Sequence, residues 1–286
     1  MNKLTINLLL ISISVGSVII SGCSKRNDSG SSMVTIKGSD TMVHLVSSWA
    51  EKYMALNPDA EISVTGGGSG TGIAAILNNT TDIAASSRSI KEKESTLAES
   101  KGIGFTRTVI AKDGIAVVVN IANEISALPL ESLRLIFTGE VTNWKQVGGA
   151  DKEIVVLSRE SNSGTHVFFQ KLVLRKDDYT QGALLMPSSS SLTQTVNDNE
   201  NAIGYVGLGY ADNAGDNVKT LSIITPDGNV IPSEETVKSG EYPIARPLLF
   251  YVNANANGKV KAFIDYCLSE EGQKIVSEIG YVSIAD

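Results

Sequence analysis

Hydrophobic positions along the chain follow two alternating periods. From Met33 onward, short runs of apolar and β-branched residues, typical of strands, alternate with segments in which apolar residues recur every three or four positions, typical of helices. In chain order, these segments are a strand-like run at 33–38, a helical one at 41–55, a strand-like run at 61–66, a helical one at 71–79, a strand-like run at 82–87 and a helical one at 90–99. This alternation predicts an α/β fold with a parallel sheet covered by helices.

Two β-rich stretches interrupt the alternation, GIAVVVN at 114–120 and PLLFYVN at 247–253. A second set of strand-like and helical segments lies between them, with a Ser-rich break at 188–191, and one long helical pattern follows at 258–279. This order predicts two lobes joined by two hinge crossings, with a ligand cleft between the lobes. The expected division is 33–115 plus 248–286 for the first lobe and 116–247 for the second.

The first residues have the pattern of an export signal. Lys3 precedes the apolar run LLLISISVGSVII at 8–20, which is shorter than the roughly 20 apolar residues of a membrane-spanning helix. The Ser-Gly-Cys that follows resembles the bacterial lipobox, so we expect residues 1–22 to be a signal peptide and Cys23 to be lipidated. The polar segment 23–32 is typical of a flexible tether. An exported protein anchored to the cell membrane is expected, with ordinary cleavage or an uncleaved anchor as alternatives.

Composition and charge exclude several classes of function. The 24 Lys and Arg residues against 31 Asp and Glu give a net charge of −7 without any basic block, so nucleic acid is not an expected partner. Once Cys23 is lipidated, Cys267 is the one remaining cysteine, and no disulfide framework is possible. Apolar spacing around Cys267 predicts that it is buried on a helix.

Three Ser/Thr/Gly turns each follow a strand-like run and open a helical segment. They are KGSDTM at 37–42, GGGSGTG at 66–72 and SRESNSGTHV at 158–167. A helix N-terminus has free backbone N–H groups and carries about half a positive charge, so three that converge would bind an anion. Further donors suited to an oxyanion would come from Ser39, Thr41, Ser69, Arg159, Ser163 and Thr165. Each turn alone is also compatible with ordinary capping.

Other phosphate and catalytic motifs are weaker. GGGSGTGIAA lacks the Lys-Ser/Thr pair of a P-loop, although GTGIAA at 70–75 satisfies a loose dinucleotide-binding pattern. The two histidines, His44 and His166, have no partner at metal-ligand spacing, and we expect no metal and no cofactor. The spacing of Ser163 and His166 leaves open a nucleophile and base, and Ser69 is the other candidate nucleophile of a phosphate-ester hydrolase.

Six segments of the chain together resemble one protein family. They are GSDTM, NPDAEISVTGGGSGTGIAAILNNTTDIAASSR, IFTGEVTNWKQVGG, VVLSRESNSGTHVFF, AIGYVGLGYA and LSEEGQKIVSEIGYV. In this order they resemble the phosphate-binding proteins of bacterial ABC phosphate importers, over nearly all of residues 33–286. The resemblance implies a two-lobe periplasmic-binding-protein fold of type II that closes on inorganic phosphate. It also implies a monomeric, non-enzymatic receptor that delivers phosphate to an ABC permease.

The resemblance extends to individual residues of the expected ligand site. Ser69 matches the family's first-lobe serine, and three further residues, Ser163, Gly164 and Thr165, match its second-lobe Ser-Gly-Thr cap. Arg159 matches the second-lobe arginine.

Two positions depart from a well-studied branch of the family. Asp40 stands where that branch has threonine, and Ser87 stands where it has the aspartate that accepts the proton of the ligand. We therefore expect the acidic role to have moved to Asp40, flanked by Ser39 and Thr41, with Arg88 either pairing with this carboxylate or reaching the ligand. Asp40 as a simple helix cap is the alternative.

Ligand choice and biological role leave alternatives open at this point. A buried carboxylate accepts hydrogen bonds only, so it would favour phosphate, which carries a proton near neutral pH, over sulfate, which does not. A receptor for another tetrahedral oxyanion, a phosphate-sensing or adhesion module and a tethered hydrolase remain the competing hypotheses.

Overall fold

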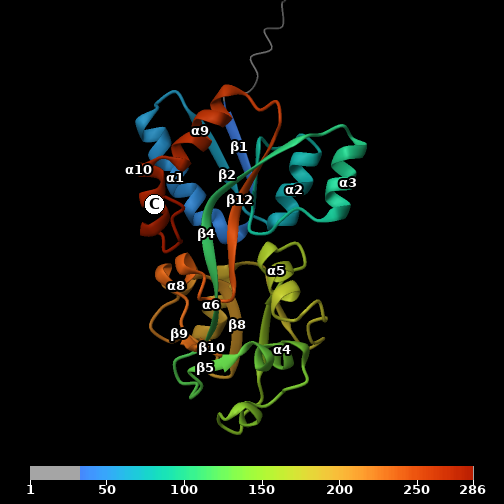
Figure 1. Cartoon of the computed structure of the whole chain (residues 1–286), viewed down its shortest axis with the longest axis vertical. Coiled ribbons are helices and arrows are strands. Elements are labelled where there is room, and N and C mark those ends of the chain that lie inside the picture. The colour runs from blue at the N-terminus through green and yellow to red at the C-terminus, as the bar shows by residue number, and fades with distance from the viewer. Residues whose placement is uncertain (1–32, 286) are drawn as a thin grey trace, which may run out of the picture. The chain divides into compact units, whose positions relative to one another are not determined.

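The computed structural model of the protein describes residues 33–285, which form one compact unit (Figure 1). The strands, in chain order, are β1 (Met33–Gly38), β2 (Glu61–Thr65), β3 (Ile83–Ser86), β4 (Phe105–Asn120), β5 (Ala127–Pro129), β6 (Val155–Arg159), β7 (Leu184–Met186), β8 (Ala202–Gly207), β9 (Val218–Thr220), β10 (Ser222–Thr225), β11 (Gly228–Val230) and β12 (Ala245–Asn253). The helices are η1 (Asp40–Met42), α1 (Val43–Leu56), α2 (Ser69–Leu77), α3 (Glu92–Ser100), α4 (Leu130–Thr138), η2 (Trp144–Val147), α5 (Gly164–Leu172), α6 (Ser189–Asp198), α7 (Leu208–Ala211), α8 (Glu234–Ser239), α9 (Gly258–Leu268) and α10 (Glu270–Glu278).

The main sheet is mixed and has the strand order β2-β1-β3-β12-β4-β8-β6-β7, with β9 paired to β4. Strand β1 is parallel to β2 and β3, and β6 is parallel to β7 and β8. Strands β4 and β12 run antiparallel to their neighbours. The predicted parallel pairing is therefore confirmed at both ends of the sheet, and the antiparallel strands lie between these ends.

Strands β4 and β12 connect the two ends of the sheet and lie side by side (Figure 1). Residues Phe105–Gly114 of β4 pair with β12, whereas Ile115–Val119 pair with β8. A single strand of 16 residues thus takes part in both ends of the sheet. The two β-rich stretches expected to form crossings, 114–120 and 247–253, lie within β4 and β12.

Two large hydrophobic cores occupy the two ends of the main sheet. The first surrounds Trp49 and Phe250 and packs α1, α9 and α10 against β1, β3 and β12. The second surrounds Phe169 and Tyr205, whose rings stack with their centroids 4.1 Å apart. We call β1–β3 with α1–α3, α9 and α10 the first lobe, and β5–β8 with α4–α6 the second lobe. Two separate cores fit the expected two-lobe α/β fold, while the expected boundaries at residues 115 and 247 stay predictions.

Two local predictions differ from the structure. The long helical pattern at 258–279 is two helices, because Ser269 is extended (φ −66°, ψ 164°) and its hydroxyl accepts a hydrogen bond from the Gly272 N–H as the cap of α10. The Ser-rich stretch expected as a break instead begins helix α6, since the Ser188 hydroxyl caps the N–H of Ser191. Cys267 is buried on α9, as predicted.

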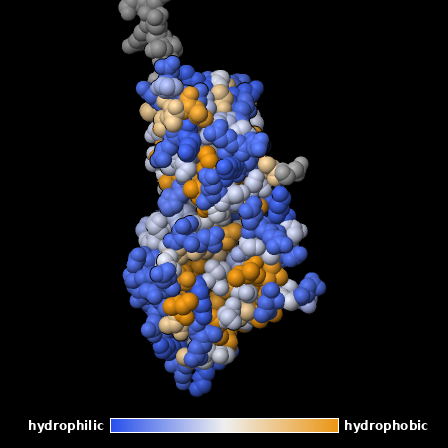
Figure 2. Space-filling model, turned by 90° about the vertical axis from the view of Figure 1, so that its left-hand side faces the viewer, coloured by the Kyte–Doolittle hydropathy of each residue, from blue (hydrophilic) through white to orange (hydrophobic). Residues whose placement is uncertain are grey.

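Polar side chains cover most of the face shown in Figure 2, where hydrophobic side chains form smaller groups. Within residues 33–285, no helix combines the length and the apolar character that a membrane crossing requires. The expected signal peptide, the tether and Cys23 lie outside the described residues.

Candidate functional site

The three glycine-rich turns meet where the two lobes face each other. In the second turn, Gly68 has a φ of +94°, and an added Cβ would lie 2.7 Å from the Asn162 carbonyl oxygen of the third turn. The Gly70 N–H donates to that same oxygen at 2.9 Å. Gly164 is still closer to the first lobe, because a Cβ there would lie 2.2 Å from Ser69 Oγ. The glycines therefore allow backbone from the two lobes to approach without side chains between them, and the second and third turns are in contact.

Buried hydroxyl groups fill this meeting point. Ser39 Oγ donates to Ser87 Oγ at 2.9 Å, and Ser87 Oγ lies 3.3 Å from Ser69 Oγ. Across the lobes, Thr41 Oγ1 lies 2.8 Å from Thr165 Oγ1. The structure thus brings the expected serines and threonines of both lobes into one cluster, which we call the hydroxyl cluster: Ser39, Thr41, Ser69, Ser87, Ser163 and Thr165.

Neighbouring N–H groups fix the direction in which several of these hydroxyls can donate. Ser69 Oγ accepts from the Ser87 N–H at 3.0 Å, and Ser163 Oγ accepts from the His166 N–H at 3.4 Å. Thr165 Oγ1 accepts from Arg246 Nη2 at 3.0 Å. A hydroxyl has one proton and two lone pairs, so a hydroxyl that accepts from an N–H keeps its own proton for another acceptor. The cluster therefore presents oriented donors.

Arg159 and Asp40 form an ion pair across the lobes, with Arg159 Nη2 3.1 Å from Asp40 Oδ2. The guanidinium is almost fully buried and donates to the Met186 and Pro187 carbonyls and to Ser189 Oγ. Asp40 Oδ2 accepts from both the N–H and the hydroxyl of Ser189, at 2.8 and 3.0 Å. Asp40 of the first lobe is therefore fixed to the start of α6 in the second.

The expected pairing of Arg88 with Asp40 is wrong. Arg88 instead forms a two-point ion pair with Glu94, with distances of 2.8 and 2.7 Å. Glu94 is six residues away at the start of α3, where it also accepts from the Lys91 N–H. Burial alone would raise the pKa of Glu94, but the hydrogen bonds from Arg88 and Lys91 lower it. Arg88 reaching the ligand stays a prediction.

A second buried ion pair next to the cluster escaped the sequence analysis. Asp113 on β4 and Arg246 on β12 are fully shielded from solvent, with Arg246 Nε and Nη2 at 3.0 and 2.8 Å from Asp113 Oδ2. Arg246 also donates to the Ser87 carbonyl, and Asp113 Oδ1 accepts from the Leu208 N–H. Burial raises the pKa of Asp113, against the opposing effect of the Arg246 charge. The sequence did contain one indication of this pair, because Asp113 and Arg246 each directly precede one of the two β-rich stretches predicted to form the crossings.

The three arginines nearest the hydroxyl cluster each face a carboxylate. The pairs are Arg88 with Glu94, Arg159 with Asp40 and Arg246 with Asp113. Each pair is close to neutral as a unit, so the attraction for an anion comes from oriented N–H and O–H donors rather than from excess positive charge. Such a site can bind an anion even though the whole protein has a net negative charge.

The arrangement does not favour the nucleophile-and-base hypothesis. Ser163 Oγ accepts from the His166 backbone N–H as the cap of α5. The His166 ring faces away from it, with Nδ1 3.2 Å from Ser158 Oγ, and burial lowers the pKa of His166. Within residues 33–285, no group of three or more His, Cys, Asp or Glu residues is arranged to hold a metal ion.

Fold and site together define a two-lobe solute-binding protein. The PBP superfamily domain matches residues 24–271. The phosphate-binding protein PstS of Bacillus subtilis is 36% identical over 267 residues, which cover 93% of this chain and 85% of that protein. PstS of Borreliella burgdorferi is 30% identical, with 99% of both chains covered. The chain belongs to the PstS family of phosphate-binding proteins.

Solved structures agree with this assignment. A phosphate ABC transporter substrate-binding protein from Clostridium perfringens, with bound phosphate, matches with a TM-score of 0.81 and 33% identity, covering 88% of this chain and all of the other. An ABC-type phosphate transport receptor from Vibrio cholerae matches with a TM-score of 0.71 and 33% identity, covering 88% and 99% of the two chains. The expected periplasmic-binding-protein fold is thereby confirmed.

Proposed function

We propose that this protein is an extracytoplasmic receptor that binds inorganic phosphate between its lobes and delivers it to an ABC permease. The observation that carries the proposal is the hydroxyl cluster, in which the hydroxyls of Ser69 in the first lobe and of Ser163 and Thr165 in the second accept hydrogen bonds from N–H groups and can donate their own protons. An anion that accepts hydrogen bonds on all its oxygens suits such a cluster. Phosphate binding by the B. subtilis relative and the phosphate in the C. perfringens structure support the same ligand.

The proposed ligand contacts come from the two lobes. Donors from the first lobe are Ser39, Thr41, Ser69 and Ser87, and those from the second are Arg159, Ser163, Thr165 and the backbone N–H of Gly164. Arg159 uses three of its five N–H groups in hydrogen bonds to the protein, so part of its fork stays available to an oxyanion. Arg88 is a further proposed ligand contact, and its position beside Gly70 of the second glycine-rich turn is the observation that supports it.

Asp40 is the proposed acceptor for the proton that phosphate carries at neutral pH. Within the described residues, its side-chain hydrogen bonds and its ion pair with Arg159 all involve Oδ2, so Oδ1 is left to accept a proton from the ligand. Sulfate has no such proton, and two acceptors would then face each other. Sites built on hydrogen bonds discriminate against such mismatches by roughly 10⁴- to 10⁵-fold.

The proposal includes a lipid anchor at Cys23, a tether at 23–32 and export by a signal peptide at 1–22. These assignments rest on the sequence pattern alone. Delivery to a permease is supported by the family membership, because the V. cholerae relative is described as a transport receptor. A monomeric receptor on the outer side of the cell membrane is the simplest arrangement that combines these features.

Isothermal titration of the purified protein with phosphate, arsenate and sulfate at neutral pH tests the proposed ligand. We expect phosphate to bind with a dissociation constant of about 1 μM or tighter, and sulfate to bind roughly 10⁴-fold more weakly. Arsenate shares the charge, shape and proton of phosphate and should bind comparably. Binding of sulfate in preference to phosphate, or binding of neither, would contradict the proposal.

A further inference from the structure

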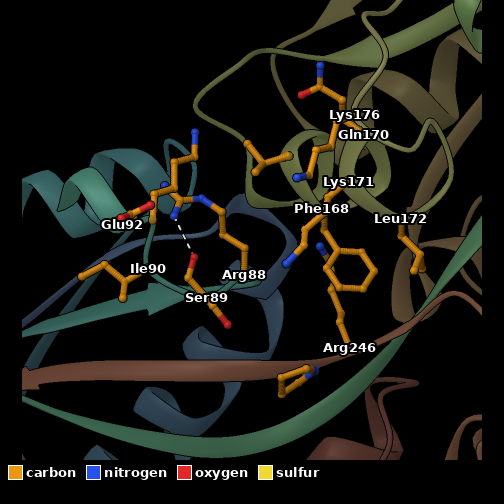
Figure 3. A pocket seen from close by; sticks show the side chains of 13 residues that line it. Arg88, Ser89, Ile90, Glu92, Phe168, Gln170, Lys171, Leu172, Lys176 and Arg246 are labelled. Carbon is orange, nitrogen blue, oxygen red and sulfur yellow. Dashed lines mark hydrogen bonds between the residues drawn. The ribbon is translucent and has the colours of Figure 1, made fainter. Parts of the chain in front are cut away.

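A groove of about 830 Å³ opens beside the hydroxyl cluster, and Figure 3 shows the side chains that line it. One wall is the segment 88–92 of the first lobe, and the other is formed by α5 with Lys176. In Figure 3, Arg88 and Ile90 lie on one side, Phe168 and Lys171 lie on the other, and Arg246 lies at the base. We call this groove the cationic vestibule.

We propose that the cationic vestibule is an outer binding site for small dianions, where phosphate is held before it reaches the hydroxyl cluster. The inference rests on the proposed function, and it adds a second, weaker site on the path of the ligand. Three observations carry it: the excess of positive charge in the vestibule, its apolar walls and its contact with the hydroxyl cluster.

The positive charge comes from lysines. Arg88 and Arg246 line the vestibule, but Glu94 and Asp113 neutralise them. The remaining charged lining residues are three lysines, at positions 91, 171 and 176, and one glutamate, Glu92, so the excess is 3 − 1 = +2. This local excess contrasts with the net charge of −7 for the whole chain. Phosphate repelled by the rest of the surface would be attracted here.

Lys91 lies beside another cation that lines the vestibule, Arg88. Burial lowers the pKa of the Lys91 ammonium, and the nearby Arg88 charge lowers it further. The Lys91 charge also contributes to the lowered pKa of His166 on α5, after the larger effect of burial. Lys91 of the first lobe thus acts electrostatically on the second lobe across the vestibule. A dianion between the two walls would relieve this repulsion.

Apolar side chains form much of the remaining wall, among them Ile90, Phe168 and Leu172. The Arg246 guanidinium carbon lies 5.7 Å from the centre of the Phe168 ring. Clefts with charges of one sign and walls of low dielectric constant focus the electric field and raise the rate of ligand association by about 10- to 10³-fold. The apolar lining therefore strengthens the effect of the lysines.

Two arginines connect the vestibule with the hydroxyl cluster. Arg246 lines the groove and donates to Thr165 Oγ1 and to the Ser87 carbonyl, at 3.0 Å in both cases. Arg88 is about 95% buried, and its Nε–H has no hydrogen-bond partner in the described part of the chain. The back wall of the vestibule is therefore also a wall of the hydroxyl cluster, and an anion held by the lysines lies next to the inner site.

The test compares two triple variants that lose the same charge. The first, Lys91→Gln with Lys171→Gln and Lys176→Gln, removes the excess charge of the vestibule. The control removes three exposed lysines from α1, α9 and α10, in the variant Lys52→Gln with Lys261→Gln and Lys274→Gln. For each full-length protein, titration gives the dissociation constant for phosphate, and release into an excess of a fluorescent phosphate reporter gives the dissociation rate. Their ratio gives the association rate constant at several salt concentrations.

We expect the vestibule variant to associate about tenfold more slowly than the control at low salt, with a weaker dependence on salt, while its dissociation rate stays within about twofold. Equal association rates in the two variants would overturn the vestibule and leave the proposed function intact. A large increase in the dissociation rate would also overturn it, because the lysines would then contact the bound ligand. If the wild type does not bind phosphate, both proposals fail.

Discussion

At the scale of single residues, Asp40 is the residue on which the proposed choice between phosphate and sulfate depends. Its carboxylate is fixed by Arg159 and by two donors of Ser189, all on one oxygen. A residue that merely capped its helix would accept hydrogen bonds from the N–H groups of its own first turn, whereas the Asp40 carboxylate accepts from the N–H and the hydroxyl of Ser189. The side-chain contacts of Asp40 run to the opposite lobe.

We predict that Asp40→Asn lowers the selectivity for phosphate over sulfate. The amide can donate a hydrogen bond to an unprotonated oxygen, so the mismatch that excludes sulfate disappears. Phosphate affinity should fall by about tenfold or more, which corresponds to about 1.4 kcal/mol, and sulfate affinity should rise. Titrations of wild type and variant with both anions measure the ratio of the two affinities.

The ratio separates the two roles of Asp40. Loss of the ion pair with Arg159 would weaken both anions together and leave the ratio unchanged, whereas loss of a proton acceptor changes it. Asp59→Asn, at an exposed position, is the matched control for the change of charge. A variant with an unchanged ratio would return the proton-acceptor role to another residue.

At the scale of secondary-structure elements, the site depends on the approach of helix α5 to helix α2. Gly164 is the first residue of α5, and its Cα faces the Ser69 and Ser87 hydroxyls. We predict that Gly164→Ala weakens phosphate binding by about 100-fold, because the added methyl group would lie 2.2 Å from Ser69 Oγ and 3.0 Å from Ser69 Cβ in the closed protein. Opening of the lobes relieves this clash, so the thermal stability of the ligand-free protein should change little.

Gly258→Ala provides a matched control, since Gly258 is also the first residue of its helix and a Cβ there meets no atom within 4 Å. Titration with phosphate and thermal unfolding without it should be measured for both variants. Phosphate binding by Gly164→Ala at wild-type affinity would show that the lobes do not close to this distance around the ligand.

The sequence predicted the turns and helix starts that position most residues of the candidate site, because these features depend on residues that are close together in the chain. The glycine-rich turn before Ser69 and the cap at Ser163 are examples. The ion pair of Asp113 and Arg246 was not predictable in this way, since it joins residues 133 positions apart. Ser189 was missed for a related reason: a serine run favours both loops and helix caps, and its contact with Asp40 depends on how the lobes meet.

At the scale of the whole molecule, the acidic charge and the nearly neutral ion pairs of the site determine how an anion is bound. The net charge of −7 repels phosphate at long range, so affinity depends on short-range donors in a cleft shielded from water. The same charge bears on membrane attachment. An acidic surface is not attracted to anionic lipids, and no helix within residues 33–285 is suited to span a membrane.

We predict that Cys23→Ser releases the protein from membranes without loss of phosphate binding, because the lipobox-like sequence places the proposed anchor at Cys23, outside the proposed ligand site. Removal of residues 1–22 would take away one positive charge, that of Lys3, so the mature protein would have a net charge of −7 − 1 = −8 and would be held mainly by its acyl chains. Burial of these chains contributes about 0.8 kcal/mol for each CH₂ group.

Membrane fractionation of a bacterial host and metabolic labelling with palmitate measure retention and acylation, while titration of the released protein measures binding. Ser24→Ala, which keeps the cysteine, is the control and should remain in the membrane fraction. If Cys23→Ser stays there as well, the apolar run at 8–20 is an uncleaved anchor and the lipobox assignment is wrong. If the variant is released but no longer binds phosphate, the tether and the site are not independent.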